Sequence, residues 1–317
     1  MVQGVVMKFA FALALPFVMS AGLAGAAVDP ALLALMPADA SALFGIEAKK
    51  VLASPFGNFA LSQVSSNEGV VRLAALTGFD YRSDLEEALG ATVLPEGTRA
   101  SIVLAKGHFD VTKFMALAAS TGSTVTGYKN AQIITLPDED RTALAFLDAT
   151  TLAIGTSATV QAAADRYAAH AHFSGPLAER ALEASDSSDI WFATVTPVAN
   201  FFNPDAPPFA VAFYQNIVAA SGGLQFSTSG ATLSSRLTTM TALQAQTLLT
   251  ATQLIAAAIG RMGRNYNSDA SRLAAIVSAG QFTVNGNSIV VSAPIPEKTL
   301  EEMYSARPAP TKKASIR

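Results

Sequence analysis

The sequence predicts an α+β fold in which antiparallel sheet is layered with helices, and three observations lead to that class. Short β-branched and aromatic segments recur in pairs separated by turn residues, which is typical of hairpins. Helical segments separate these pairs, whereas single strands alternate with helices in a doubly wound parallel sheet. The order of segments after residue 170 also resembles the order before it. The sequence therefore predicts two related repeats of strands and helices.

The first 26 residues have the pattern of an export signal. Lys8 precedes an apolar run over residues 9–19, and Ala24-Gly25-Ala26 offers the small residues that signal peptidase recognises. Cleavage after Ala26 or Ala27 would deliver a periplasmic or secreted protein. An uncleaved membrane helix is the alternative, but the apolar run is shorter than the roughly 20 residues that a bilayer requires. Ala26 also stands where a lipid-carrying cysteine would be needed.

The composition excludes several classes of site and partner. The chain has no cysteine, so disulfides, iron–sulfur clusters, thiolate zinc sites and thiol nucleophiles are excluded. The formal net charge of −3 is too small to indicate nucleic-acid binding. Charged residues make up only 14% of the chain, where about 25% is usual. Because hydrophobic residues make up 50%, we expect a large core and a surface covered by uncharged polar side chains.

The first half, residues 27–170, is expected to mix strands and helices. Asp29-Pro30 is a helix start, because Asp caps the first turn and Pro fits the first helical position. Ser83 and Glu86 have the spacing of a capping box, which predicts a helix from residue 83 to about residue 89. Other strands are expected at residues 41–48, 99–106, 125–128, 132–136, 142–147 and 151–155, and other helices at residues 49–63, 68–76, 111–121 and 157–169.

The second half, residues 171–306, is expected to follow a similar order. A type I′ turn at Asn285-Gly286 joins two of its strands. Residues 152–167 and 290–304 both have the pattern strand, turn, helix, and they end in Tyr167 and Tyr304. Residues 307–317 are expected to be a disordered tail. Strands are expected at residues 189–196, 224–229, 232–239, 282–284 and 288–292, and helices at residues 211–220, 242–262, 270–279 and 297–305.

The second half is also poor in charge. Between residues 206 and 260, Arg236 is the only charged residue. Within the helix expected at residues 242–262, Leu248, Ala251 and Ile255 fall three and four residues apart and therefore share one face. Scattered Gln and Thr argue against a membrane span. The segment is either a buried helix or a surface that contacts a partner protein or lipid.

An aromatic, proline-rich segment in this half is the candidate interaction surface. Its rings are Phe201, Phe202, Phe209, Phe213 and Tyr214. Prolines within the segment oppose regular structure, so exposed rings would form the contiguous apolar patch that marks a binding site. The alternative is that these rings fill the core between the two halves.

No catalytic, cofactor-binding or metal-binding motif is present in the sequence. The nucleophile elbow, the P-loop, the dinucleotide fingerprint and the zinc-peptidase motif are all missing. The histidines are His108 in KGHFD and the pair His170 and His172 in AHAHF. A His-x-His pair holds a metal only with further ligands nearby. We therefore assign no catalytic residue, no cofactor and no metal.

Two short segments carry a resemblance. Residues 77–89, TGFDYRSDLEEAL, and residues 104–109, LAKGHF, resemble motifs of a group of uncharacterised secreted bacterial proteins. In that group an export signal precedes a PADAS segment, which stands here at residues 37–41. The likeness covers mainly residues 37–167. It implies export, and it carries over no activity and no functional residues.

These observations predict an exported, non-enzymatic protein that binds a partner protein or an apolar ligand through its charge-poor second half. No transmembrane helix is expected after cleavage of the signal. One alternative is an exported hydrolase, which would place a histidine opposite a carboxylate or serine in a pocket. Another is a structural or assembly subunit, in which the charge-poor region would lie between copies.

Overall fold

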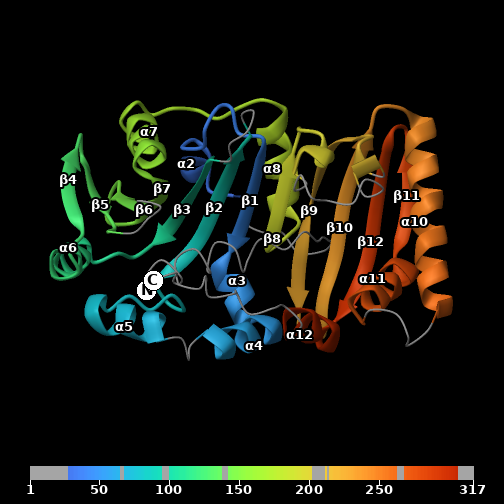
Figure 1. Ribbon diagram of the computed structural model, residues 1–317, viewed down its shortest axis with the longest axis horizontal. Helices are drawn as coiled ribbons and strands as arrows, with labels where there is room; N and C mark the ends of the chain where they lie inside the picture. The colour runs from blue at the N-terminus through green and yellow to red at the C-terminus, as the bar shows by residue number, and fades with distance from the viewer. Residues whose placement is uncertain are drawn as a thin grey trace, which may run out of the picture.

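The computed structural model describes residues 28–64, 68–94, 100–137, 142–201, 211–212, 214–262 and 268–305. Its strands form one twelve-stranded sheet in the order β11-β12-β10-β9-β8-β1-β2-β3-β7-β6-β5-β4, which runs the length of the molecule (Figure 1). Neighbouring strands within the described residues are antiparallel throughout. The predicted α+β class with antiparallel sheet is confirmed.

The strands have the following bounds: β1 Ala42–Glu47, β2 Leu85–Val93, β3 Ala100–Gly107, β4 Thr124–Tyr128, β5 Ala131–Thr135, β6 Thr142–Phe146, β7 Thr151–Thr156, β8 Ile190–Thr194, β9 Ile217–Ser227, β10 Gly230–Thr239, β11 Gln281–Asn285 and β12 Ser288–Pro296. The helices are α2 Pro30–Leu33, α3 Ala48–Ala53, α4 Pro55–Val64, α5 Glu68–Thr77, α6 Val111–Ser120, α7 Ser157–Ala168, α8 Pro176–Asp186, η1 Val198–Phe201, α10 Ala242–Met262, α11 Ser268–Ala279 and α12 Glu297–Ser305.

The two halves of the chain meet where β1 pairs with β8. Phe44 lies opposite Phe192 at the centre of this antiparallel ladder. The strand order outward from β1 is β1-β2-β3-β7-β6-β5-β4, and the order outward from β8 is β8-β9-β10-β12-β11. The fourth strands of the two series correspond as well, because β7 leads directly into α7 and β12 leads directly into α12. The sheet thus has the repeated order that the sequence predicts, and it is continuous across residue 170.

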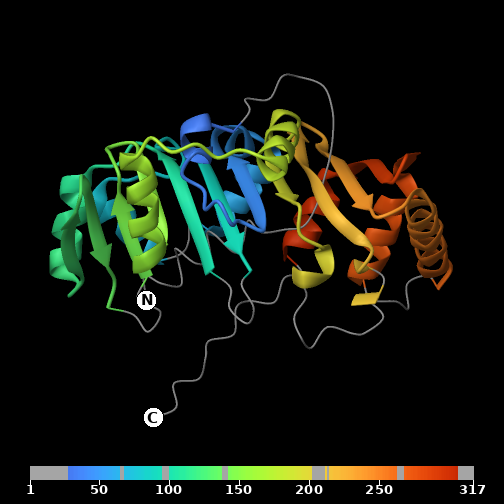
Figure 2. The same cartoon turned by 90° about the horizontal axis from the view of Figure 1, so that it is seen from above.

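Helices cover both faces of the first half of the sheet. Neighbouring residues on one strand enter different cores, because successive side chains of a strand point to opposite faces. Leu104 belongs to the core under α2, α7 and α8, whereas Ala105 belongs to the core under α5 and α6. Figure 2 shows the sheet from above, roughly along its strands, with helices on either side of it in this half.

In the second half, helices α4, α10, α11 and α12 pack against one face of the sheet. Leu233 and Leu237, which share a face of β10, contact the clusters under α12 and α10 respectively. The opposite face of β10 carries the half-buried Ser234, Arg236 and Thr238. Arg236 pairs with Glu183 of α8 over a distance of 2.8 Å. This arrangement is typical of an antiparallel sheet with one packed and one hydrated face.

The segment around α2 is buried in the first core. Val28, Leu32 and Met36 are at most 2% exposed and belong to the largest hydrophobic cluster. The Asp29 carboxylate caps α2 by accepting a hydrogen bond from the Ala31 amide, at 2.7 Å, as the sequence predicts. Residues just after the expected cleavage position are therefore part of the folded core.

Two expectations about local structure were wrong, and one helix was not expected. Residues 85–93 form strand β2 instead of the helix that the capping-box spacing predicted, because Glu87, Leu89 and Ala91 alternate into the first core. Tertiary pairing with β1 and β3 therefore overrides the local helix signal. Strand β9 begins at Ile217, within the helix expected at residues 211–220. The helix α8 was not predicted at all, although Pro176 stands at its first turn.

The turn between β11 and β12 also differs in type from the prediction. Its two central residues are Gly286 and Asn287, which lie between the ends of the strands. Gly286 has a φ of 59°, whereas Asn287 is not among the described residues with positive φ. A type I′ turn requires positive φ at both central positions, so this turn belongs to another class that favours glycine first. The export signal and the tail at residues 307–317 lie outside the described residues.

Substitution of Gly45 tests the junction between the halves. Gly45 of β1 lies opposite Trp191 of β8, and a Cβ atom at Gly45 would overlap the indole ring. We expect Gly45→Ala to lower the free energy of unfolding by about 1–3 kcal/mol through overpacking. Chemical denaturation measures this loss. Gly127→Ala in β4 is the control, because nothing lies within 4 Å of the added Cβ; an equal loss in both variants would contradict the packing.

Candidate functional site

The outer face of α10 is the most exposed apolar surface of the described residues. Ala245, Leu248, Leu249 and Ala256 point toward the sheet and are buried. On the opposite face Leu243 is 77% exposed and Leu254 is 65% exposed. Ten large hydrophobic side chains are exposed in the described chain, and the five from Met240 to Leu273 belong to α10, α11 and the residue pair before α10. These five side chains mark one end of the molecule.

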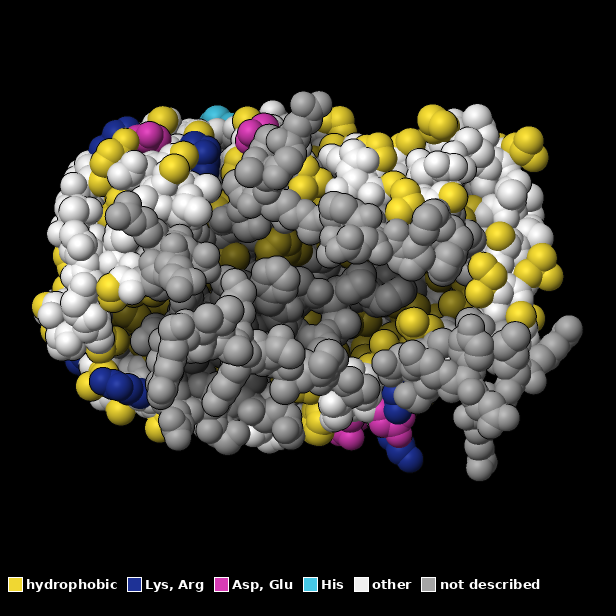
Figure 3. All heavy atoms as spheres, in the orientation of Figure 1, with side chains coloured by type: hydrophobic (Ala, Val, Ile, Leu, Met, Phe, Trp, Pro, Cys, Tyr) yellow, Lys and Arg dark blue, Asp and Glu magenta, His cyan; other side chains and the backbone are white. Residues whose placement is uncertain are grey.

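The described side chains of α10 over residues 242–258 carry no charge. The exposed residues of α10 between positions 242 and 258 are Ala, Leu, Ile, Gln and Thr. Thr247 and Thr250 bond back to backbone carbonyls of their own helix, at 2.8 Å and 2.9 Å. Figure 3 shows yellow and white side chains over this end of the visible face, whereas the dark blue and magenta side chains gather elsewhere. Most surface helices carry charged or polar side chains on the face that points to solvent. This face instead combines exposed leucine with threonines whose hydroxyls bond to their own helix.

The orientation of α10 differs from the expected one. The spacing of Leu248, Ala251 and Ile255 predicted one shared face, but Leu248 is buried while Ile255 is 50% exposed. The helix carries apolar residues on more than one stripe, so spacing alone could not indicate which stripe packs on the sheet. Contacts with Ile217 and Ile289 select the stripe that includes Ala245 and Leu249. Leu243 and Leu254 were therefore missed as surface residues.

The predicted aromatic surface is only partly within the described residues. Phe201 ends η1 and is half-buried. Tyr214 is half-buried against the cluster of Ile217 and Leu248, and burial raises the pKa of its phenol. The remaining rings of the surface, Phe202, Phe209 and Phe213, lie outside the described residues. Tyr214 therefore packs in the buried cluster beneath α10, on the side of the helix that faces the sheet.

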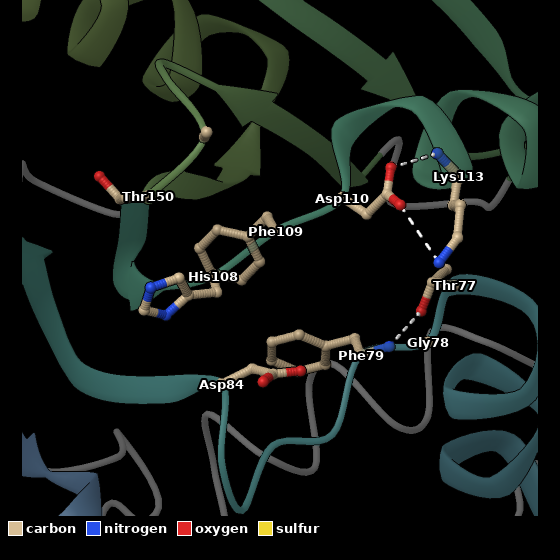
Figure 4. A pocket seen from close by; sticks show the side chains of 10 residues that line it. Thr77, Gly78, Phe79, Asp84, His108, Phe109, Asp110, Lys113 and Thr150 are labelled. Carbon is tan, nitrogen blue, oxygen red and sulfur yellow. Dashed lines mark hydrogen bonds and ion pairs between the residues drawn. The ribbon is translucent and has the colours of Figure 1, made fainter.

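A second candidate is a depression of about 340 Å³ in the first half. His108 and Asp84 lie on one side of it, and Asp110 and Lys113 lie on the other (Figure 4). Phe109 forms part of its wall. The depression thus contains the histidine and carboxylates that an acid–base site would require.

The carboxylates of this depression are already bound to their own turns. Asp84 accepts hydrogen bonds from the Asp80 amide at 2.8 Å and the Ser83 hydroxyl at 3.0 Å. Asp110 caps α6 and pairs with Lys113 at 3.2 Å, and these contacts lower the pKa of its carboxyl. Within the described residues neither carboxylate forms a hydrogen bond or ion pair with His108. The charges here stabilise the turn before β2 and the start of α6.

The other histidines do not form a metal centre in the described structure. His170 follows α7 with a φ of 48°, in the left-handed region. Across residues 28–305, wherever the chain is described, no three His, Cys, Asp or Glu side chains gather as a metal would require. Within the same residues, no helix combines the length and apolar character needed to span a membrane.

Comparison with known proteins shows a fold and no family. No protein-family model and no curated protein matches the chain. Crystal form IV of TP0453 aligns with a TM-score of 0.55 at 12% identity, over 89% of this chain and 98% of that one. Crystal form III aligns with a TM-score of 0.55 at 11% identity, over 88% and 99%, and crystal form I with 0.50 at 11%, over 88% and 98%. The chain is therefore similar to TP0453 in fold alone.

Two substitutions in the depression should have very different effects on stability. Phe109 is 6% exposed and stacks on Phe79 with ring centres 5.4 Å apart. We expect Phe109→Ala to cost about 3–5 kcal/mol, because it leaves a cavity in an aromatic core. His108→Ala should change the free energy of unfolding by no more than about 0.5 kcal/mol, because the imidazole is exposed. Urea denaturation measures both; a large loss in His108→Ala would show a structural partner for that imidazole.

Proposed function

We propose that this chain is an exported, non-enzymatic protein that binds an apolar partner, a protein or a lipid-like molecule, through its charge-poor second half. The observation that carries this proposal is the outer face of α10, whose described residues 242–258 carry no charge and where Leu243 and Leu254 are largely exposed. Exposed contiguous apolar surface is typical of interaction sites. Export is supported by the pattern of residues 1–26 and by the burial of Val28, which begins the folded core.

The position of α10 favours binding over a role in internal packing. The helix stands at the end of the molecule that β11 borders, so a partner reaches its outer face without displacing another described element (Figures 1 and 2). Burial of a leucine side chain contributes about 1.5–3 kcal/mol to association. Burial of Leu243 and Leu254 would therefore contribute a large part of the binding free energy of a complex of moderate affinity.

Native copurification with matched variants tests the proposal. The protein is purified from the exported fraction, and bound proteins and lipids are identified by mass spectrometry. We expect the affinity of the double variant Leu243→Glu, Leu254→Glu for its partner to fall more than about tenfold. The reason is that binding would bury each new carboxylate against an apolar surface. The control is Val71→Glu, Leu76→Glu on α5, where side chains 55% and 47% exposed lie in the other half of the molecule.

The outcomes distinguish the occupants of this face. A second copy of the chain as the partner would appear as a dimer in light scattering and would indicate an assembly subunit. Equal copurification with wild type and both double variants would contradict binding through α10. Copurification with no partner at all would contradict the proposed function.

A further inference from the structure

A buried carboxylate lies beside the first residues of the folded chain. Glu87 on β2 is 5% exposed. Both of its carboxylate oxygens accept from the Asp29 amide, at 3.2 Å and 3.3 Å. The preceding amide, that of Val28, donates to the Ser185 hydroxyl of α8 at 3.0 Å. Because Val28 is 1% exposed, these contacts lie within the core.

The surroundings of Glu87 contain more negative than positive charge. Glu47 lies directly opposite Glu87 in the ladder between β1 and β2, and Asp189 adjoins Glu47. Lys106 on β3 is the cation that acts on Glu87, but it forms an ion pair with Asp29. Lys49 and Lys50 act on Glu47 instead. Burial is the largest influence on the pKa of Glu87, and together with the charges of Glu47 and Asp29 it raises that pKa to about 7, against the lowering effects of the Asp29 amide and Lys106. A cation beside Glu87 would therefore lower its electrostatic free energy.

The expected cleavage position would place a cation here. Gly25 and Ala27 satisfy the small-residue pattern of signal peptidase, so Val28 can become the first residue. The backbone nitrogens of Val28 and Asp29 are at most about 4 Å apart, which places the Val28 nitrogen within about 7 Å of the Glu87 carboxylate. An α-amino group is an ammonium ion at neutral pH, with an ordinary pKa of about 7.7–8.0.

We propose that Glu87 and Ser185 form a binding site for the α-ammonium group of Val28, which is created when the leader is removed. This inference rests on the proposed export. The leader is released by hydrolysis of the Ala27–Val28 peptide bond: the hydroxyl of one water joins the Ala27 carbonyl carbon, and its hydrogen joins the Val28 nitrogen. The amine then takes a proton from solvent. Ser185 accepts one of its three N–H donors, and Glu87 supplies the counter-charge.

The site links processing to folding. A buried ammonium is costly unless a carboxylate pairs with it, and the only described carboxylate of the segment itself, Asp29, is occupied by Lys106. In the uncleaved chain Glu87 keeps a raised pKa, so stability falls as the pH rises from about 4.5 to 7. After cleavage the pair raises the pKa of the ammonium group, so its stabilisation is present below about pH 7.7 and is lost at higher pH.

Amine labelling of the processed protein tests the inference. The chain is produced with its leader and purified from the exported fraction, and its intact mass identifies the first residue. The Val28 amine is then labelled with isotopic acetic anhydride between pH 6 and 10, and labelling is quantified by mass spectrometry. We expect the pH midpoint of Val28 amine labelling to lie at least one pH unit above about 8. Labelling at pH 7 should then be about tenfold slower than labelling of an exposed α-amine.

Matched variants separate charge pairing from burial. Glu87→Gln keeps an acceptor for the Asp29 amide but removes the charge, and it should speed labelling about tenfold at pH 7. Glu86→Gln is the control, because Glu86 is half-buried on the same strand and its carboxylate pairs with Lys49 at 2.6 Å instead of with the segment around Val28. A chain that begins at Val28 and has an amine midpoint at or below about 8 overturns the inference alone, even if Glu87→Gln does not fold. A chain that begins at Ala27 also overturns it, and a chain that keeps its leader overturns the proposed export as well.

Discussion

The antiparallel pairing of β1 with β8 is the constraint on which the rest of the structure depends. Without this ladder each half would present an unpaired strand edge, with a row of exposed backbone donors and acceptors. Because of this ladder, β1 and β8 are interior strands, and β4 and β11 are the edge strands of the sheet. Gly45 permits the close contact, because the Trp191 ring occupies the space of a side chain there. The paired strands then form the floor of the largest core, into which the segment from Val28 to Met36 docks.

This central junction also determines where charge is tolerated. Buried and half-buried charges gather near the middle of the sheet, where Glu47, Glu87 and Lys106 lie on three successive strands. Lys106 pairs with Asp29, whereas burial raises the pKa of both Glu47 and Glu87. Toward β11, threonine, serine and alanine are frequent, and the exposed residues of α10 between positions 242 and 258 are uncharged. The described residues therefore place buried charge near the middle of the sheet and exposed leucine on α10.

Much of this fold could be predicted from the sequence, because hydrophobic period and turn residues are local signals. The bounds of α10, Ala242–Met262, agree with the prediction, as does the order of the strands that lead into α7 and α12. The prediction of a helix at Ser83 was wrong because a capping box is also compatible with a turn, and only pairing with β1 and β3 distinguishes the two. The exposed stripe with Leu243 could not be identified, because its packing partners are distant in sequence. The role of Glu87 was hidden for the same reason.

The continuity of the sheet is the central claim, and hydrogen exchange followed by mass spectrometry tests it most directly. If the ladder between β1 and β8 joins both halves into one cooperative unit, amides of β1, β2, β8 and β9 should be the slowest to exchange. They should also share one free energy of opening, within about 1 kcal/mol. The result that would contradict this claim is separate behaviour, in which β8 and β9 exchange through an opening of clearly lower free energy while β1 and β2 stay protected.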